Sequence, residues 1–446
     1  MNIIIAGAGD VGFHLAEMLV KNDQNIILID ADENTLEYAA QKLDVSTIHG
    51  DCSSPEILTN ADAKEADLFI AVTTRHSTNI LACSLAKKLG ARKTIARTNT
   101  AEYLAPEHRQ HFVELGVDEL FSPRDLAVQE IERLLNRISA TDVFEFENGS
   151  ISLLGFAVHH PSPLIGRSFS YLNEESTDYH VKVVCVLRNN ETLIINKENV
   201  IQKDDHIYIA ADNSGVKLVN KFIGKNLRRL NNIMITGNTE LALQTAKALE
   251  DDRNVKIVVT GNDKCKHFAK TLNKSLIIKG DPSNSELLME EGLEQMDAFI
   301  ALTKNSETNI LTSLMAEQSK KTKTISLVDN MAYMHISQSI GVDTIINKKL
   351  LAANEIFRHV RVGHIKAIAS FHGVEGEIIE FSIDEDNHLT RKPLCDLGVP
   401  STAVFVGVVR KNEGIIPKSN FQLQIGDQLI VYALPDCIKT VERIFN

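Results

Sequence analysis

The sequence predicts an α/β protein in which two doubly wound parallel sheets are each followed by a small α+β domain. The first reason is a repeat: residues 3–97 align with residues 233–327, and residues 186–188 recur at 408–410. The second is that short apolar runs alternate with helical patterns inside each long copy, as in βαβ units. The 446-residue chain is therefore expected to be a tandem duplication of the form A-B-A-B.

The change from alternating strands and helices to closely spaced strands sets the expected domain boundaries. We expect large domains at residues 1–140 and 229–362, and small domains at residues 141–228 and 363–446. A chain of 446 residues has room for several domains of ordinary size.

The first large domain opens with a motif for binding a dinucleotide. Residues 2–6 are apolar and β-branched, as in a buried central strand, and the glycine loop Gly-Ala-Gly-Asp-Val-Gly follows at residues 7–12. A helical pattern then begins at Phe13, and the next apolar run ends in Asp30. A glycine loop between a strand and a helix, with an acid at the end of the second strand, is typical of Rossmann-like domains.

Each part of this motif has a physical role. Gly7 allows a tight turn, Gly9 lets the backbone approach a diphosphate, and Gly12 lets the helix pack closely on the strand. The carboxylate of Asp30 accepts hydrogen bonds from both ribose hydroxyls and repels a 2′-phosphate, which favours NAD(H) over NADP(H). The alternative is a tight turn with no ligand.

Polar residues end the remaining strands of this domain. Strands are expected at residues 46–49, 68–72 and 93–96, followed by Asp51, by Thr73 and Thr74, and by Arg97. Ligands bind at the carboxyl ends of strands in such sheets, so the threonines are candidates for ribose or phosphate contacts. Arg97 either neutralises a phosphate or forms a surface ion pair. A sixth strand is expected near Leu120, with a helix from Pro123.

The second large domain keeps the pattern but changes the chemistry. Of the first loop's glycines only Gly237 remains, and Thr239 narrows the approach to a diphosphate. At a constant shift of 230 residues, Thr260 replaces Asp30 and Leu327 replaces Arg97. The second site is expected to be empty, weak or used by another nucleotide.

The small domains are expected to form hairpins. Strands are predicted at residues 181–188, 193–195 and 204–209, and again at 403–410, 415–416 and 426–431. Arg188 and Arg410 are candidates for binding an anion, although a salt bridge at a strand end is the stronger expectation.

Composition argues against several classes of function. A net charge of −12 argues against binding nucleic acid, and no apolar run reaches the length of a membrane span. The six cysteines show no CxxC spacing, so buried reduced thiols and no metal site are expected. The chain enters a strand at Asn2, which predicts a cytoplasmic protein without a signal peptide.

No catalytic pair accompanies the predicted cofactor site. A dehydrogenase needs a proton-transfer group near the nicotinamide, and the small domains contain no His/Asp or Tyr/Lys pair at catalytic spacing. His49 and His76 lie near strand ends, but each is also consistent with a solvated loop. Duplication with one altered copy suits a sensor, whereas an NAD-dependent oxidoreductase and a scaffold stabilised by its nucleotide are the alternatives.

The order of these motifs resembles a known family. The segments at residues 5–12, 29–30, 50–51, 71–79 and 96–99 are similar to the regulator-of-potassium-conductance (RCK, or KTN) domain. The small domains, with Pro163–Arg167 and the turn at Gly426 and Asp427, resemble its C-terminal companion. Two such pairs in one chain resemble the TrkA-like regulatory subunits of bacterial Trk potassium uptake.

The resemblance implies a function and a set of binding residues. It implies an oligomeric gating ring, dimeric or tetrameric, on the cytoplasmic face of a TrkH- or TrkG-like membrane potassium transporter. Such a ring binds NAD(H) and often responds to ATP or ADP. The resemblance implies no catalytic residues. The implied first-site residues are Gly7, Ala8, Gly9, Asp10, Val11, Gly12, Asp30, Asp51, Cys52, Thr73, Thr74 and Arg97, with Asp51 and Cys52 beside the adenine. In the second copy they are Gly237, Asn238, Thr239, Glu240 and Leu241.

Overall fold

A computed structural model describes most of the chain. The described residues are 1–20, 24–136, 142–146, 149–158, 162–168, 180–189, 191–194, 200–222, 230–318, 322–330, 333–334, 342, 344–357, 365–370 and 374–445. The expected boundaries at 140/141, 228/229 and 362/363 lie outside them. The chain divides into two compact units, one of residues 1–127 and 347–360, the other of residues 128–346 and 361–446.

The first unit is built on a six-stranded parallel sheet in the order β3-β2-β1-β4-β5-β6. This is the strand order of a Rossmann domain, so the predicted doubly wound sheet is confirmed. The strands are β1 (Asn2–Ala6), β2 (Asn25–Asp30), β3 (Ser46–His49), β4 (Leu68–Ala71), β5 (Lys93–Arg97) and β6 (Glu119–Phe121). The helices are α1 (Asp10–Val20), α2 (Glu33–Lys42), α3 (Pro55–Asn60), η1 (Ala63–Glu65), α4 (His76–Leu89), η2 (Ala101–Leu104), α5 (Pro106–Glu114) and the start of α6 (Pro123–Asn136).

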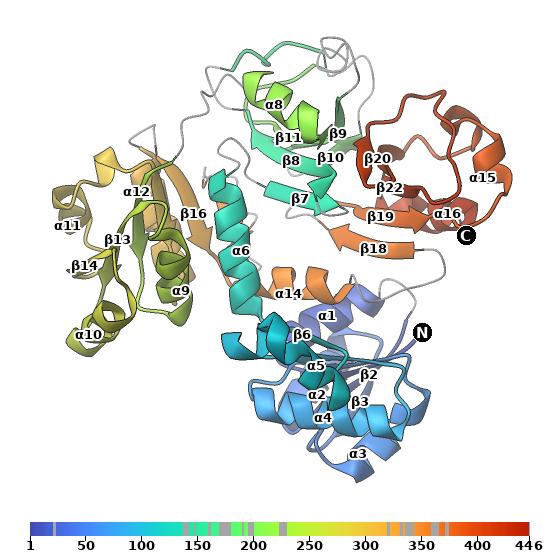
Figure 1. Cartoon of the computed structure of the whole chain (residues 1–446), viewed down its shortest axis with the longest axis horizontal. Helices are drawn as coiled ribbons and strands as arrows, with labels where there is room; N and C mark the ends of the chain where they lie inside the picture. The colour runs from blue at the N-terminus through green and yellow to red at the C-terminus, as the bar shows by residue number, and fades with distance from the viewer. Residues whose placement is uncertain are drawn as a thin grey trace. The chain divides into compact units, whose positions relative to one another are not determined.

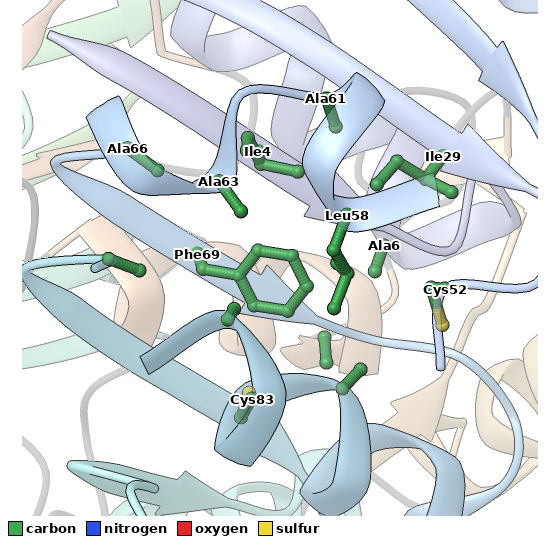
Figure 2. Close-up of a cluster of buried hydrophobic side chains, with 14 of the residues drawn as sticks. Ile4, Ala6, Ile29, Cys52, Leu58, Ala61, Ala63, Ala66, Phe69 and Cys83 are labelled. Carbon is green, nitrogen blue, oxygen red and sulfur yellow. The ribbon is translucent and has the colours of Figure 1, made fainter. Parts of the chain in front are cut away.

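Small side chains let the helices pack tightly on one face of this sheet. Figure 2 shows the ring of Phe69 with Leu58 and Ala63 beside it, and all three side chains are fully buried. Cys52 and Cys83 are buried in the same cluster. One face of the apolar strands predicted from their β-branched runs is therefore covered, as expected for a parallel sheet.

A helix from far along the chain completes the first unit. Helix α14 (Lys348–Phe357) follows the last strand of the second parallel sheet, yet it packs against α1 (Figure 1). Its first turn is capped by the buried side chain of Asn347, whose Oδ1 accepts hydrogen bonds from the backbone N–H groups of Lys349 and Leu350. The sequence predicted the repeat but not this exchange.

The second unit contains a parallel sheet of the same topology, in the order β14-β13-β12-β15-β16-β17. Its strands are β12 (Asn232–Thr236), β13 (Asn254–Val259), β14 (Leu276–Lys279), β15 (Ala298–Ala301), β16 (Lys323–Leu327) and β17 (Thr344–Ile346). Its helices are α9 (Glu240–Leu249), α10 (Asn262–Thr271), α11 (Ser285–Glu290), η4 (Leu293–Gln295) and α12 (Ser306–Glu317).

Strand pairing corrects one detail of the repeat. Asp30 pairs with His49 in the first sheet, and Val259 pairs with Lys279 in the second. Val259 therefore occupies the position of Asp30, and the prediction that Thr260 does so is wrong. The constant shift of 230 fails because β13 begins one residue early in register, at Asn254 opposite Asn232. Neither Val259 nor Thr260 has a carboxylate, so the acidic group of Asp30 has no counterpart at the end of β13.

Two small antiparallel sheets complete the second unit. Their strand orders are β10-β9-β11-β8-β7 and β21-β20-β22-β19-β18, so corresponding strands occupy the same places in both sheets. The first contains β7 (Asp142–Phe146), β8 (Ile151–Ala157), β9 (Val181–Arg188), β10 (Glu191–Ile194) and β11 (His206–Asp212), with helix α8 (Asn213–Phe222). The second contains β18 (Ile365–Ser370), β19 (Glu377–Ser382), β20 (Ala403–Arg410), β21 (Glu413–Ile415) and β22 (Gln428–Ala433), with α15 (His388–Arg391), η5 (Leu394–Asp396), η6 (Pro435–Cys437) and α16 (Ile438–Phe445). The predicted small α+β domains are confirmed.

The arginines at the ends of β9 and β20 form salt bridges. Arg188 Nε lies 2.7 Å from Asp205 Oδ1, and Arg410 Nε lies 2.8 Å from Asp427 Oδ1. Both aspartates are buried and also accept a backbone N–H, so each pair closes the turn before the last strand. The structural expectation for these arginines is confirmed.

The two small sheets share one hydrophobic core. Ile151 and Cys185 of the first sheet and Val406 and Tyr432 of the second belong to a single buried cluster. No helix in the described ranges is long and apolar enough to cross a membrane. All six cysteines are free, but Cys395 is exposed and Cys265 is half-buried, so the expectation of burial is wrong for these two.

Candidate nucleotide site

The glycine loop adopts a conformation that its sequence requires at two positions. Gly7 has a φ of +107°, and a β-carbon there would lie 2.9 Å from the backbone nitrogen of Thr73. A β-carbon at Gly12 would lie 1.8 Å from the carbonyl oxygen of Gly7. The turn and the close approach of α1 to β1 therefore explain these two glycines without any ligand.

Gly9 is different from the other two glycines of the loop. A β-carbon at this position would meet no protein atom within 4 Å. Neither packing nor a positive φ requires glycine here. The space over Gly9 lies beside the N-terminus of α1, where free N–H groups favour an anion. A side chain at residue 9 would occupy that space, so the loop fits a diphosphate.

Asp30 is held against this loop by the backbone. Its Oδ2 accepts a hydrogen bond from the backbone N–H of Ala8 at 2.6 Å, and its Oδ1 accepts one from Asp32 at 2.9 Å. The carboxylate is therefore fixed at the carboxyl end of β2. Each carboxylate oxygen keeps a further lone pair, which suits two neighbouring ribose hydroxyls.

A buried asparagine joins the ends of β4 and β5. Asn79 Oδ1 accepts hydrogen bonds from the backbone N–H and the hydroxyl of Thr73, and its Nδ2 donates to the carbonyls of Thr73 and Arg97. Asn309 makes the same four bonds with Thr303 and Leu327 in the second copy. Asn79 and Asn309 occupy matching positions of the repeat, but the sequence alone indicated no role for either of them.

Arg97 lies half-buried at the carboxyl end of β5. Its Nε is buried with no hydrogen-bond partner, and it forms no ion pair among the residues that the structure describes. Burial lowers the pKa of the guanidinium. The surface ion pair, one of the two expectations for Arg97, is not formed among the described residues, and the side chain is half-buried.

The remaining predicted residues differ in exposure. Asp51 is exposed, and hydrogen bonds from the backbone and hydroxyl of Ser53 hold the pKa of its carboxyl below the usual range. Thr74 is exposed at the same edge. The Cys52 side chain is buried in the core, and burial raises its pKa to about 11. Only the backbone of Cys52 therefore faces the edge of the sheet.

In the second loop Thr239 stands at the position of Gly9, so a side chain is present where the first loop has none. Thr239 is the N-cap of α9, where its hydroxyl accepts from the backbone N–H of Ala242 and donates to the carbonyl of Leu302. Gly237 keeps a φ of +137°, so the turn is conserved within the repeat. Leu327 is buried where Arg97 stands in the first copy. The two loops thus share the turn at their first glycine but differ in the side chain two residues later and in the residue that ends the fifth strand.

Comparison with known proteins identifies the family. Residues 3–123 and 233–348 match the family model of the TrkA-N domain, and residues 378–446 match that of the TrkA-C domain. The first of these models covers more than half of the chain.

The chain belongs to the TrkA family. The TrkA protein of Haemophilus influenzae, a Trk system potassium uptake protein, is 30% identical over 100% of this chain and 99% of its own length. The crystal structure of the GsuK RCK domain matches with a TM-score of 0.61 at 15% identity, over 100% of this chain and 94% of that one. The GsuK channel bound to NAD matches with a TM-score of 0.60 at 14% identity, over 100% and 78%. These structures show a shared fold, and the family resemblance drawn from the motifs is confirmed.

Proposed function

We propose that this TrkA-family chain is a peripheral regulatory subunit that binds NAD(H) in its first parallel-sheet domain and gates a membrane potassium transporter. The observation that carries the proposal is Gly9, a glycine that no protein contact requires, beside an anion-binding helix start. The Haemophilus influenzae relative is named as a potassium uptake protein, and a structure of similar fold has NAD bound, which supports the same assignment here.

The proposed binding residues lie along the carboxyl edge of the first sheet. In this proposal residues 7–12 contact the diphosphate, Asp30 binds the ribose hydroxyls, and Arg97 meets a phosphate. Thr73, Thr74, Asp51 and the backbone of Cys52 complete the edge. ATP and ADP present the same ribose and phosphates, so they are candidate competitors for this site. In the second copy we propose that any nucleotide contact, at residues 237–241, is weaker, because Thr239 fills the loop.

The ionisable groups of the edge favour regulation over catalysis. Hydrogen bonds lower the carboxyl pKa of Asp51, and of Asp32 through Thr35, while burial raises the thiol pKa of Cys52 to about 11. A general acid or base works best with a pKa near neutrality, so these shifts run the wrong way. Of the two histidines near strand ends, His49 Nε2 lies 3.0 Å from the Ala31 carbonyl oxygen, and the His76 ring packs against Tyr103.

In the proposed mechanism, a homo-oligomer of this chain docks on the cytoplasmic face of a TrkH- or TrkG-like membrane subunit. Nucleotide in the first domain favours one arrangement of the domains over another, and that arrangement opens or closes the pore. The ligand shifts this equilibrium only by its difference in affinity for the two arrangements. We assign the four domains to residues 1–140, 141–228, 229–362 and 363–446.

The first test is NADH binding to the Asp30→Ala variant. We expect the variant to lose about 1–3 kcal/mol of binding free energy, because a charge-assisted partner of the ribose is removed. Isothermal calorimetry on the full chain measures this, with Thr260→Ala, at the same edge of the second sheet, as the matched control. Equal affinity of the Asp30→Ala variant and the wild type contradicts the assigned site.

The second test separates regulation from the two alternatives. The chain is reconstituted with its membrane partner, and potassium flux is measured with and without NADH, NAD+, ATP and ADP. A change in flux that Asp30→Ala abolishes supports the proposal. A nucleotide that raises the melting temperature without changing flux indicates a scaffold, and turnover at the nicotinamide absorbance band indicates an oxidoreductase.

A further inference from the structure

A lysine from the second half of the chain reaches the glycine loop of the first half. Lys349 Nζ lies 3.0 Å from Oδ2 of Asp10, the residue that begins α1. Lys349 stands in the first turn of α14, which follows the sixth strand of the second sheet but belongs to the compact unit of the first. The repeat gives no reason for a cation from residue 349 at residue 10.

Buried residues anchor the helix that carries this ammonium group beside the loop. The Lys349 side chain is 21% exposed, whereas Asp10 is 78% exposed. Asn347, which is fully buried, caps the same turn, and Leu350, Ala353 and Ile356 are buried along the helix. An ion pair with so exposed a carboxylate adds little stability by itself. The position of the Lys349 charge is therefore better explained by an anionic ligand that binds at the glycine loop.

A diphosphate at this loop would meet the charge of Asp10. The backbone N–H groups at the start of α1 attract an anion, but the Asp10 carboxylate, one residue from Gly9, repels it. Lys349 neutralises that carboxylate. Its flexible ammonium has three donors, so it is able to turn from Asp10 to a phosphate oxygen.

We propose that Lys349 is a phosphate-binding residue of the first nucleotide site, supplied by the second half of the chain. The inference rests on the proposed function, since it assumes that a nucleotide binds at the loop. It makes nucleotide binding and the docking of α14 on α1 mutually dependent, because thermodynamic linkage is reciprocal. Occupancy of one copy is thereby transmitted to a helix that belongs to the other copy by sequence.

The test compares Lys349→Met with the wild type as full-length proteins. We expect affinity for NADH and for ADP to fall about fivefold, the scale of one partly exposed charge contact, and affinity for adenosine, which has no phosphate, to stay unchanged. Lys88→Met removes the same charge from the exposed side of α4 and should bind like the wild type. Lys349→Arg keeps the charge and should retain most of the affinity.

A double-mutant cycle with Asp10→Asn distinguishes contact from neutralisation. If Lys349 binds the phosphate directly, Asp10→Asn strengthens NADH binding and Lys349→Met still weakens it in that background. Equal NADH affinity of the double variant and of Asp10→Asn alone overturns the proposal. Hydrogen exchange gives an independent readout: NADH should slow exchange in α14 of the wild type and not of Lys349→Met.

The outcomes also separate this inference from the proposed function. Absence of NADH, NAD+, ADP and ATP binding to the wild type defeats the proposed function. Wild-type binding with an unchanged Lys349→Met affinity defeats only the role of Lys349. If Lys349→Met fails to fold, which its melting transition would reveal, the Lys349→Arg and Asp10→Asn variants decide. Loss of NADH binding in Lys349→Arg contradicts direct contact. Weaker NADH binding in Asp10→Asn contradicts it as well.

Discussion

The three glycines of the first loop have different physical reasons, which predict different mutant behaviour. Gly9→Ala places a methyl group where no protein atom lies within 4 Å, so stability should change little. NADH affinity should fall at least tenfold, because the methyl group occupies the path of the diphosphate. Calorimetry and thermal unfolding measured together check both parts.

Gly12→Ala is the contrasting variant. Its β-carbon would lie 1.8 Å from the Gly7 carbonyl oxygen, so α1 must shift and the unit should lose stability. If Gly9→Ala destabilises the protein as strongly as Gly12→Ala does, then Gly9 serves packing and the assignment of a diphosphate site loses its main support.

The sequence predicted the glycine loop and Asp30 correctly as neighbours, because their spacing follows from the geometry of a βαβ unit. It placed Thr260 wrongly because aligning two copies at a constant shift ignores single-residue changes in loops. It could not decide between the two roles of Arg97, since pairing depends on which carboxylates the fold brings near. The structure shows no such partner among its described residues.

At the scale of elements, one asparagine in each large domain fastens a helix to two strands. Asn79 is fully buried and uses both amide hydrogens and its oxygen, bonding to Thr73 and to the Arg97 carbonyl. Asn79→Ala leaves buried backbone groups without partners. We expect this to destabilise the β4–β5 region by about 2–4 kcal/mol. Hydrogen exchange of peptides from β4 and β5 measures the change.

Asn309→Ala is the matched control, since Asn309 makes the same bonds in the second copy. It should destabilise the second sheet to a similar extent without lowering NADH affinity. Asn79→Ala should lower that affinity because Thr73 and Arg97 lose their support. Equal effects of the two variants on binding would contradict the assignment of the site to the first copy.

The element pattern was predictable where hydrophobic runs were long, and the six strands of the first sheet follow it closely. The location of α14 was not predictable. Its apolar residues, such as Ala353 and Ile356, indicate a buried helix face but not which sheet covers that face. A duplicated chain offers two nearly equivalent partners for such a helix, and only the three-dimensional arrangement distinguishes them.

At the scale of the whole molecule, duplication has produced paired domains that have since diverged. The two parallel sheets keep the same strand order, and the two small sheets keep theirs and share one core. The internal comparison therefore separates what folding requires, such as Gly7 and Gly237, from what one copy alone retains, such as Gly9 and Arg97. The retained set is the proposed nucleotide site.

A half-buried lysine where the two small sheets meet predicts how stability depends on pH. Lys182 Nζ donates to the carbonyl of Phe405 at 3.0 Å, a contact between the two sheets. Burial lowers the pKa of Lys182 to about 8, from 10.5 in the unfolded chain. Because the unfolded state binds more protons between these values, the contribution of Lys182 to stability rises with pH across that window.

The measurement is urea unfolding of the wild type and Lys182→Met at several pH values from 7 to 10. The stability of the wild type relative to the variant should increase by about 1–3 kcal/mol as the pH rises. The comparison is made at each pH because burial also raises the pKa of Cys185 to about 12, which lowers stability in both proteins above about pH 9 as the unfolded thiol ionises. A difference that stays flat from pH 7 to 10 would show that Lys182 is solvated as an ordinary surface lysine. The contact with Phe405 would then not place a buried charge between the sheets.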